Sequence, residues 1–452
     1  MNPRSILALA GVAALALSGC VKNADPNATD AINVSSTVDD CKVSSSSTTS
    51  GNVTFAVKND GEKVTEFYLL AEDGLSIIGE VENIAPGTSR NLTVQAQPGS
   101  YFTECKPGMV GEGVGRKDFE VTGEQVEVDA NSQEATDAAV AAYTAYTKDQ
   151  VARLVTEVEK FVAAYIAGND DLARELFPLA RTSYERIEPT ASQFGDLDPK
   201  IDYRKPGAEA EGIEFTGFHR IEMDLWLDEA RKNYPDEKIT ALTEAGRAKY
   251  GDQLVADVTA LNEKVTADDF VLTLADITNG AIGLLDEVAA PDGKLPGEED
   301  EFSHTDLYDF YANVEGAKVA FESVRNIANS KGETAKELVG DLDEQFAKML
   351  ALLHTYGNYD EGFVSYDTVS QEKRNELGAQ LNALSAPLSP WADRCGRSCW
   401  RSWRRRRGRD CHQQGNSGCT RNSAVPRRSS GRDHHRRPRT SLLRLLRLDF
   451  DR

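Results

Sequence analysis

GIEFTGFHRIEMDLW, residues 212–226, is the stretch on which the interpretation of this fold depends. Within it His219 and Glu222 stand three residues apart, a spacing that places both side chains on one face of a helix. An imidazole and a carboxylate placed in this way can bind one metal ion. The same spacing also occurs in ordinary helix packing, with the histidine between helices and the glutamate in solvent. The rest of the chain has to distinguish these two interpretations.

The charge of the chain is unevenly distributed along its length. The 452 residues carry a formal charge of −22, but residues 391–452 contain 18 Arg, no Lys, 5 Asp and no Glu. This tail therefore has a net charge of +13, and the part before it has −35. An acidic body of this kind repels nucleic acids and anionic surfaces and attracts cationic ligands. We expect no nucleic-acid partner.

Residues 1–20 have the features of a secretory signal of the lipoprotein kind. Arg4 provides a short positive start, residues 6–17 are almost wholly apolar, and the sequence LSGC ends at Cys20. The apolar run is too short to span a membrane. LSGC is similar to a bacterial lipobox, which implies cleavage before Cys20, acylation of its thiol and a lipid-anchored, extracytoplasmic protein, in the periplasm or on the outer face of the cell membrane. A plain signal peptide with an incidental cysteine is the alternative.

Residues 21–30 are expected to form a flexible tether, and residues 31–130 show the pattern of a small β-domain. Large apolar side chains alternate with small or polar ones at residues 53–58, and similar short runs recur between turn sequences rich in Asn, Pro and Gly. This pattern predicts an antiparallel sandwich or barrel. Cys41 and Cys105 both belong to this segment, and outside the membrane such a pair predicts a disulfide.

Copper binding is the alternative use of Cys105. The sequence CKPGM from Cys105 to Met109 is similar to a ligand loop that runs from a cysteine to a methionine. A blue-copper site normally also needs two histidines, and the β-domain contains none. Redox copper chemistry is therefore not expected there, and a weak cation site that uses Asp39, Asp40, Glu104 or Met109 is the alternative.

After Asn131 the apolar pattern changes its period, and the new pattern predicts a helical domain at residues 137–388. Apolar residues recur at every third or fourth position from Val151 to Tyr165, as in an amphipathic helix. Similar patterns follow with short links, which indicates an all-α bundle of about seven to nine helices, or two bundles side by side. The later helices are expected at residues 172–194, 215–233, 239–265, 268–288, 306–330, 333–356 and 369–384.

Several ionisable side chains lie among the apolar residues of these helices. Glu185 and Glu188 are again three residues apart, and Glu315 lies in a stretch of small and apolar residues, where an unpaired carboxylate is costly. His304 precedes one expected helix, and Asp236 follows another. Carboxylates and one imidazole from several helices are typical ligands of iron or manganese, with zinc also possible. For each acid alone, a solvated surface charge is the alternative.

Three segments, GFHRIEMDLW, RTSYERIEP and SHTDLYDFYANVEGAKVAFE, resemble the imelysin-like domain, a peptidase family with an H-x-x-E motif. The segment ENIAPGTSRNLTVQAQPGSYFTEC is similar to the cupredoxin-like N-terminal domain of EfeO-type iron-uptake lipoproteins. Together the resemblances cover residues 31–388. They imply the extracytoplasmic component of an EfeUOB-type system, which captures iron and passes it to a membrane permease, with a haem peroxidase-like partner.

The resemblance also implies a set of metal ligands. His219 and Glu222 match the H-x-x-E pair, and Glu315 matches the acidic position of the A-N-V-E/D-G motif. Asp236 is a further implied ligand, with Asp228 as its alternative. Iron, as Fe²⁺ or Fe³⁺, is the expected cargo, with zinc or copper also possible. Additional candidates for the site are Glu185 and Glu188, which fall in a family motif, and His304.

Two functions from other classes are alternatives. The family name suggests a zinc metallopeptidase, but a zincin has H-E-x-x-H, with a glutamate between two ligand histidines. Here Arg220 follows His219 and no histidine lies four residues on. We therefore expect the protein not to be an enzyme. The other alternative is an adhesion or polysaccharide-binding lipoprotein, whose binding would not depend on metal.

Residues 389–452 do not continue the helical pattern. They contain an Arg run at residues 404–407 and four of the seven cysteines, which would suit a zinc site or a nucleic-acid arm. Neither suits an acidic extracytoplasmic lipoprotein. Abundant Arg without Lys or Glu is typical of an out-of-frame reading of a GC-rich gene. We interpret this tail as the product of a frameshift near Ser389, and we predict that it is disordered and has no function.

Overall fold

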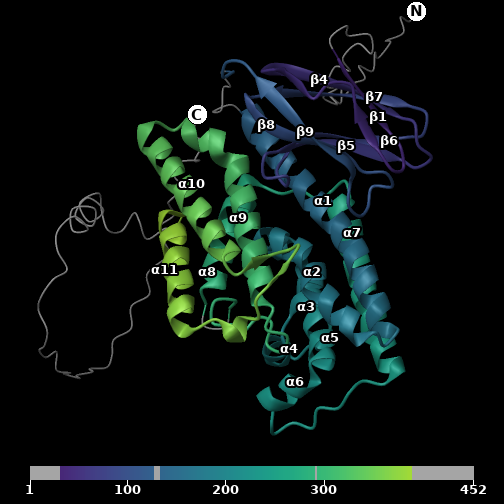
Figure 1. The fold of residues 1–452 in the computed structure, drawn as a ribbon, viewed down its shortest axis with the longest axis vertical. Coiled ribbons are helices and arrows are strands. Elements are labelled where there is room, and N and C mark those ends of the chain that lie inside the picture. The colour runs from purple at the N-terminus through teal and green to yellow at the C-terminus, as the bar shows by residue number, and fades with distance from the viewer. Residues whose placement is uncertain (1–30, 127–132, 291–292, 389–452) are drawn as a thin grey trace, which may run out of the picture.

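The structure is a computed structural model that describes residues 31–126, 133–290 and 293–388 (Figure 1). A β-rich domain is followed by a helical domain, as the sequence pattern predicts. The predictions for Cys20, for the tether and for residues 389–452 lie outside the described residues. No helix in the described part of the chain combines the length and the apolar character needed to cross a bilayer.

The β-domain contains two facing sheets (Figure 1). The first has the order β2 (Cys41–Val43), β1 (Ile32–Ser36), β4 (Gly51–Asn59) and β7 (Ser89–Ala96). The second has the order β3 (Ser47–Thr49), β9 (Val114–Thr122), β8 (Gly99–Cys105), β5 (Thr65–Ala71) and β6 (Ile77–Ile84). Most strand pairs are antiparallel, as predicted, but β1 pairs with β4 and β3 with β9 in parallel. The chain crosses to the other sheet between each of these pairs and returns in the same direction.

Apolar side chains at alternate strand positions fill the space between the two sheets. The ring of Phe55 lies 5.0 Å from that of Phe67 and 5.4 Å from that of Phe119, measured between centroids. A disulfide joins Cys41 of β2 to Cys105 of β8 and so connects the two sheets. The cysteines are 64 positions apart, and closing a loop of that length in the unfolded chain favours the folded state by about 4 kcal/mol.

The helical domain follows the predicted periodicity. Its helices are α1 (Gln133–Ile166), α2 (Asp170–Ile187), α3 (Asp198–Asp202), α4 (Lys205–Glu211), α5 (Gly217–Leu225), α6 (Leu227–Asn233), α7 (Glu244–Thr266), α8 (Leu274–Val288), α9 (Asp306–Asn329), α10 (Glu333–His354) and α11 (Gln371–Leu388). A short hairpin of β10 (Gly357–Asn358) and β11 (Gly362–Phe363) joins the last two helices. One continuous apolar core includes residues of α1, α2, α5 and α7 and of α8 to α11, so these helices form a single packed unit.

Helix boundaries differ from the expected ones where local chemistry interrupts the apolar period. Helix α2 ends at Ile187, and a 3₁₀ turn with Pro189 in its first positions follows. The expected helix at residues 215–233 is broken at Trp226, whose backbone leaves the helical region. Helix α7 begins later than expected because the Thr243 hydroxyl caps it by accepting a hydrogen bond from the Gly246 N–H. The short helices α3 and α4 were not predicted, since each is too short to show a period.

Two glycines allow the helices around α2 to pack closely. A Cβ at Gly316 of α9 would lie 2.1 Å from the carbonyl oxygen of Arg186. A Cβ at Gly280 of α8 would lie 1.7 Å from the carbonyl oxygen of Pro189. Both distances are shorter than any real contact of a Cβ atom. These two positions therefore need glycine, and through them α8 and α9 approach the end of α2.

The β-domain is joined to α1 by buried ion pairs. Lys106, which follows the disulfide-bonded Cys105, pairs with Asp149 of α1, and its side chain is fully buried. Asp149 also accepts a hydrogen bond from the Nε of Arg153, whose Nη2 donates to Glu104. Burial raises the pKa of Asp149, but the charges of Lys106 and Arg153 outweigh burial and lower it to about 2. The carboxylate of Asp149 is therefore ionised whenever the two domains are docked near neutral pH.

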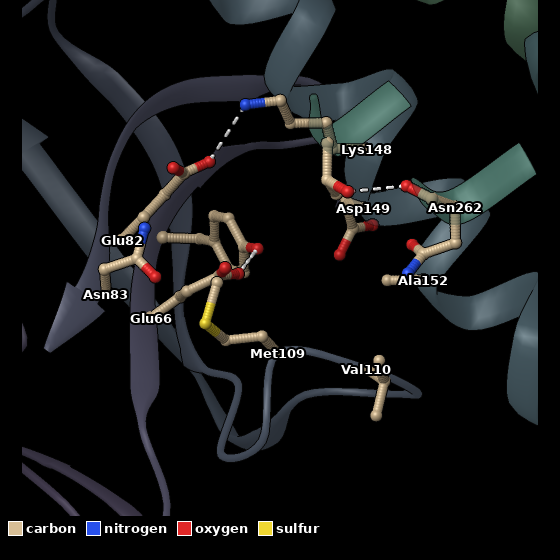
Figure 2. Close-up of a pocket in the computed structure, with 11 residues that line it drawn as sticks. Glu66, Glu82, Asn83, Met109, Val110, Lys148, Asp149, Ala152 and Asn262 are labelled. Atoms are coloured by element: carbon tan, nitrogen blue, oxygen red, sulfur yellow. Dashed lines mark hydrogen bonds and ion pairs between the residues drawn. The ribbon is translucent and has the colours of Figure 1, made fainter. Parts of the chain in front are cut away.

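A cavity of about 330 Å³ lies at this junction between the two domains (Figure 2). Burial raises the pKa of Glu66 to about 7, although the hydroxyl of Tyr68 donates a hydrogen bond to it. Of the candidate ligands for a weak cation site, Met109 lines this cavity, whereas Glu104 pairs with arginines and Asp40 with lysines. The cavity is lined by Glu66, Tyr68, Glu82, Asn83, Met109, Val110, Lys148, Asp149, Ala152, Asn262 and Thr266.

We predict that Asp149→Asn lowers the free energy of unfolding by about 3 kcal/mol at pH 7, because it leaves the ammonium of Lys106 buried without a counter-charge. Urea denaturation followed by circular dichroism measures this loss. Asp171→Asn is the matched control, since that carboxylate is fully exposed and its ion pair contributes little. The folded-state pKa of Asp149 lies below its unfolded value, so its contribution is complete above about pH 4 and lost as the pH falls toward 2. A difference between wild type and variant that stays constant from pH 6 to pH 2 would contradict this assignment.

Candidate metal centre

Helix α5 places His219 and Glu222 in the interior of the helical domain. It begins at Gly217, which has a φ of 76°, and a Cβ there would lie 2.1 Å from the carbonyl oxygen of Ile201. Only glycine therefore allows α5 to start directly against α3. Two and five residues later, His219 is 1% exposed and Glu222 is fully buried. The predicted pair does share one helix face, and that face points inward.

Glu222 is held by hydrogen bonds to both of its oxygens. Oε1 accepts from the backbone N–H of Phe302 at 3.0 Å and from the backbone N–H and the hydroxyl of Ser303, each at 2.8 Å. Oε2 lies 2.9 Å from Nδ1 of His219. A carboxylate in this position requires a proton on Nδ1 of His219, which orients the ring and directs Nε2 to the other side.

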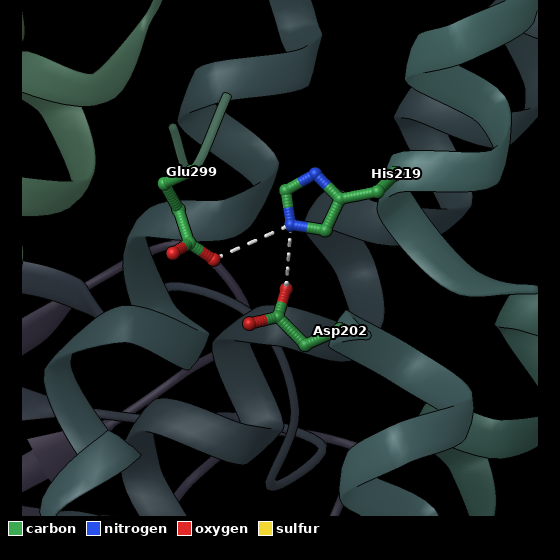
Figure 3. A group of neighbouring side chains, drawn as sticks. All are labelled: Asp202, His219 and Glu299. Atoms are coloured by element: carbon green, nitrogen blue, oxygen red, sulfur yellow. Dashed lines mark ion pairs between the residues drawn. The ribbon is translucent and has the colours of Figure 1, made fainter. Parts of the chain in front are cut away.

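Nε2 of His219 faces two carboxylates (Figure 3). It lies 3.5 Å from Oε1 of Glu299 and 3.7 Å from Oδ1 of Asp202. Among the described residues this buried nitrogen has no hydrogen-bond partner. The three atoms lie within 4.8 Å of one another, and one imidazole nitrogen with two carboxylate oxygens is a donor set that suits iron, manganese or zinc.

A second group of possible ligands shares the same histidine. Its members are His219, Glu222 and Asp300, whose ligand atoms also lie within 4.8 Å of one another, and Glu222 faces Nδ1 of the ring. Both oxygens of Glu222 already have hydrogen-bond partners, whereas Nε2 of His219 has none among the described residues. Asp202 and Glu299 are also the members that solvent reaches, with side chains 10% exposed. The side of the ring that faces Asp202 and Glu299 is therefore the better position for a cation.

Negative charge is in excess around this centre, because two buried cations face eight carboxylates. Arg181 contacts Glu185, Asp202, Glu299, Asp300 and Asp309, and Lys294 contacts Glu185, Glu188 and Glu299. The remaining carboxylates are those of Glu222 and Asp306, both buried. Burial, with repulsion from Glu222, raises the pKa of Asp300 to about 7, and burial also raises the pKa of Asp202, to about 6. A cation bound here would relieve this repulsion.

The protonation of His219 follows from the same charges. Burial and the nearby guanidinium of Arg181 lower the pKa of His219, but its contacts with Glu222 and Glu299 outweigh them and raise it to about 10. Burial also raises the pKa of Glu299, but Lys294 and His219 outweigh burial and hold it well below its usual range. At neutral pH the proton on Nε2 therefore takes the place that a metal ion would occupy.

The structure places the other sequence-predicted ligands away from Nε2. Neither group of possible ligands found in the described residues includes Glu315, whose carboxylate lies 3.0 Å from Nε of Arg186 and accepts a hydrogen bond from the hydroxyl of Tyr359. Asp228 and Asp236 are exposed in and after α6, and Asp228 pairs with Arg231. Glu185 and Glu188 bind Lys294 and Asn313, and His304 lies 3.9 Å from Glu229.

Sequence reasoning missed Asp202, Glu299 and Asp300. Asp202 ends the short helix α3, which shows no period, and Glu299 and Asp300 belong to the acidic run at residues 298–301, which looks like a solvated loop. One feature of the sequence could have indicated that these acids belong to the site. The acidic run at residues 298–301 lies just before the SHTD segment, which resembles the family. The contact of these acids with His219 depends on packing between distant segments, which spacing along the chain does not reveal.

Comparison with known proteins identifies relatives of both domains. The family model described as imelysin matches residues 139–390. The protein named "Iron uptake system component EfeO" from Escherichia coli K12 is 35% identical over 370 residues, which cover 80% of this chain and 91% of the relative. The protein of the same name from Shigella flexneri shows the same identity and coverage.

We predict that Glu222→Gln weakens Zn²⁺ binding by about 10- to 100-fold. Three donors surround Oε1, so the glutamine carbonyl must take that position and its amide group must face Nδ1 of His219. The amide then donates to Nδ1, so Nδ1 no longer carries a proton and the ring keeps the proton on Nε2, the atom that faces Asp202 and Glu299. Zinc titration measures the affinity, and long-range ¹H–¹⁵N NMR of the histidines reports the tautomer. Glu214→Gln, at an exposed surface pair, is the control, and a twofold or smaller change in Glu222→Gln would contradict the orienting role.

The raised pKa of His219 predicts that each bound cation displaces a proton. Below about pH 10 the apparent zinc affinity should fall about tenfold for each unit by which the pH falls. Below about pH 6 the slope should steepen, because Asp202 then also has to lose a proton. Zinc titrations from pH 5 to pH 8, with proton release followed in weak buffer, test both parts. Zinc affinity that is independent of pH would refute binding at Nε2.

Proposed function

This chain belongs to the imelysin family, and we propose that it serves iron uptake by binding an iron ion between His219, Asp202 and Glu299. The observation that carries the proposal is the buried Nε2 of His219, which faces two carboxylate oxygens and has no hydrogen-bond partner among the described residues. A buried polar atom without a partner is costly unless a ligand satisfies it. The names of the relatives, which are iron uptake components, support iron as that ligand.

The ligand types suit reversible iron capture. Carboxylate oxygens are hard ligands that favour Fe³⁺, and the imidazole also accepts Fe²⁺ and Zn²⁺. The excess of carboxylates over buried cations adds attraction that grows with the charge of the ion. Reduction of bound Fe³⁺ would therefore lower the affinity and allow release. Zinc remains a competitor at this donor set, and copper could use the imidazole alone, because the groups found among the described residues contain no thiolate.

In this proposal Glu222 orients His219 instead of binding iron directly. Its four hydrogen bonds use both oxygens, and a carboxylate that accepts from the free N–H of a ligand histidine is a common partner in metal sites. This role differs from the one that the H-x-x-E spacing suggests. Asp202 and Glu299 take the ligand positions that the sequence analysis assigned to Glu315 and Asp236.

The proposal also covers the delivery of iron after it has been bound at this centre. We place the protein outside the cytoplasm, anchored through lipid on Cys20, where it passes iron to a membrane permease with a haem peroxidase-like partner. The proposed division is a β-domain at residues 31–130 and an iron-binding helical domain at residues 137–388. The buried ion pair of Lys106 with Asp149 supports a fixed arrangement of the two domains during this transfer.

Peptide hydrolysis is not part of the proposal. The residue after His219 is Arg220, whose guanidinium lies over the ring of Tyr250 at 4.7 Å from its centroid. Glu222 accepts hydrogen bonds on both oxygens, so it is poorly placed to take a proton from water. Neither residue therefore provides the general base that a zinc peptidase needs.

Iron titration of the purified protein tests the assignment. We expect His219→Ala to weaken binding of both anaerobic Fe²⁺ and citrate-delivered Fe³⁺ by about 100-fold or more, and Asp202→Asn and Glu299→Gln by about 10- to 100-fold each. The double variant His219→Ala, Glu222→Ala should bind no more tightly than His219→Ala. His304→Ala is the control, because that histidine lies beside Glu229 and should leave the affinity within about twofold. Unchanged iron affinity in the double variant would refute the proposal.

A further inference from the structure

Helix α2 places Arg181 directly beside the candidate centre. Its side chain is fully buried, and its guanidinium carbon lies 5.8 Å from the ring centroid of Phe177 and 5.4 Å from that of Phe218. Its Nε donates to Oδ2 of Asp309 at 3.1 Å. The two aromatic rings and Asp309 hold the guanidinium in place, so its two terminal nitrogens have a defined position.

Those terminal nitrogens contact the oxygens proposed as metal ligands. Nη1 of Arg181 pairs with Oδ1 of Asp202, which is the oxygen that faces Nε2 of His219. Nη2 lies 3.9 Å from Oε1 of Glu299, which is again the oxygen that faces Nε2. The ammonium of Lys294, in contrast, lies 3.9 Å from Oε2 of Glu299. Arg181 is thus paired with the ligand atoms themselves, and Lys294 with the other oxygen of one ligand.

We propose that Arg181 is an internal cation that competes with the metal ion for Asp202 and Glu299. The inference rests on the proposed function and adds a means of controlling affinity. While Arg181 pairs with both carboxylates it keeps them together, so the ligands are already assembled when a cation arrives. The cation then has to share or displace these contacts and is repelled by the guanidinium charge. Binding is therefore weaker than the carboxylates alone would provide, which makes transfer to a partner easier.

The competition should depend on the charge of the metal ion. Repulsion from one guanidinium is about 1.5 times larger for a trivalent than for a divalent cation at the same position. A residue that only supported the fold would lower the affinity for every ion when it was removed. A competitor should raise the affinity, and more so for the trivalent ion. Zn²⁺ and Ga³⁺ are suitable probes because neither changes its oxidation state.

The test removes Arg181 together with one of its five carboxylate partners, as Arg181→Gln with Asp309→Asn in the full chain. Replacing this partner as well reduces the number of buried carboxylates that lose the guanidinium charge. We expect Zn²⁺ affinity to rise about 10-fold or more, and Ga³⁺ affinity to rise by a larger factor than Zn²⁺. Equal or weaker binding of both ions in the folded double variant would overturn the inference.

A matched control lies on the same helix. Arg186 and Glu315 form another arginine–acid pair, with Nε and Oε2 3.0 Å apart, away from the ligand oxygens. Arg186→Gln with Glu315→Gln should leave both affinities within about twofold of wild type. His219→Ala in the same titration separates the two proposals. If His219→Ala leaves the affinity unchanged, the proposed function fails and this inference with it; if only the Arg181 variant behaves like wild type, this inference alone fails.

A second measurement does not depend on the variant folding. Crystal structures of the wild-type full chain would be compared after treatment with a chelator and after loading with Zn²⁺. We expect zinc on Nε2 of His219 and a longer separation between Nη1 of Arg181 and Oδ1 of Asp202 in the loaded form. Zinc bound at Nε2 with both Arg181 contacts unchanged would refute the competition.

Discussion

The cost of burying charge is the constraint on which this structure depends. Eight carboxylates gather in the helical interior, and each would destabilise the fold if it lacked a counter-charge or a proton. Arg181 and Lys294 supply the buried positive charge, and His219 adds a proton. The helices that carry these groups approach one another closely because glycines stand where α8 and α9 meet the end of α2. Packing and electrostatics therefore support the same arrangement.

Most of the fold could be predicted from periodicity, because each long element buries one face. Alternation in the β-domain and the three-to-four period of the helices depend only on neighbouring residues. The predicted helix boundaries are wrong where a single residue interrupts the pattern. Trp226 divides one expected helix, and the hydroxyl of Thr243 starts another one later than the apolar residues suggest. The parallel strand pairs were missed because alternation does not report strand direction.

The candidate centre was predictable only where its residues are close in sequence. His219 and Glu222 share a helix turn, so their spacing reveals their common face. Asp202 and Glu299 reach the same histidine from segments that are far apart along the chain, and only the tertiary packing brings them together. Glu315 shows a different limit, since the sequence indicates that a buried acid needs a partner but does not say whether the partner is a metal ion or, as here, Arg186 and Tyr359.

The three residues at the end of β8 have separate neighbours. Glu104 contacts Arg153 of α1, Cys105 is bonded to Cys41 in the opposite sheet, and Lys106 reaches Asp149 of α1. Two of these links are ionic, and the one between them needs an oxidising environment to form. The strand end that contacts α1 is therefore held inside the β-domain by a bond that depends on thiol oxidation, so a chain kept under reducing conditions would make its ionic contacts with α1 from a strand that lacks this covalent link.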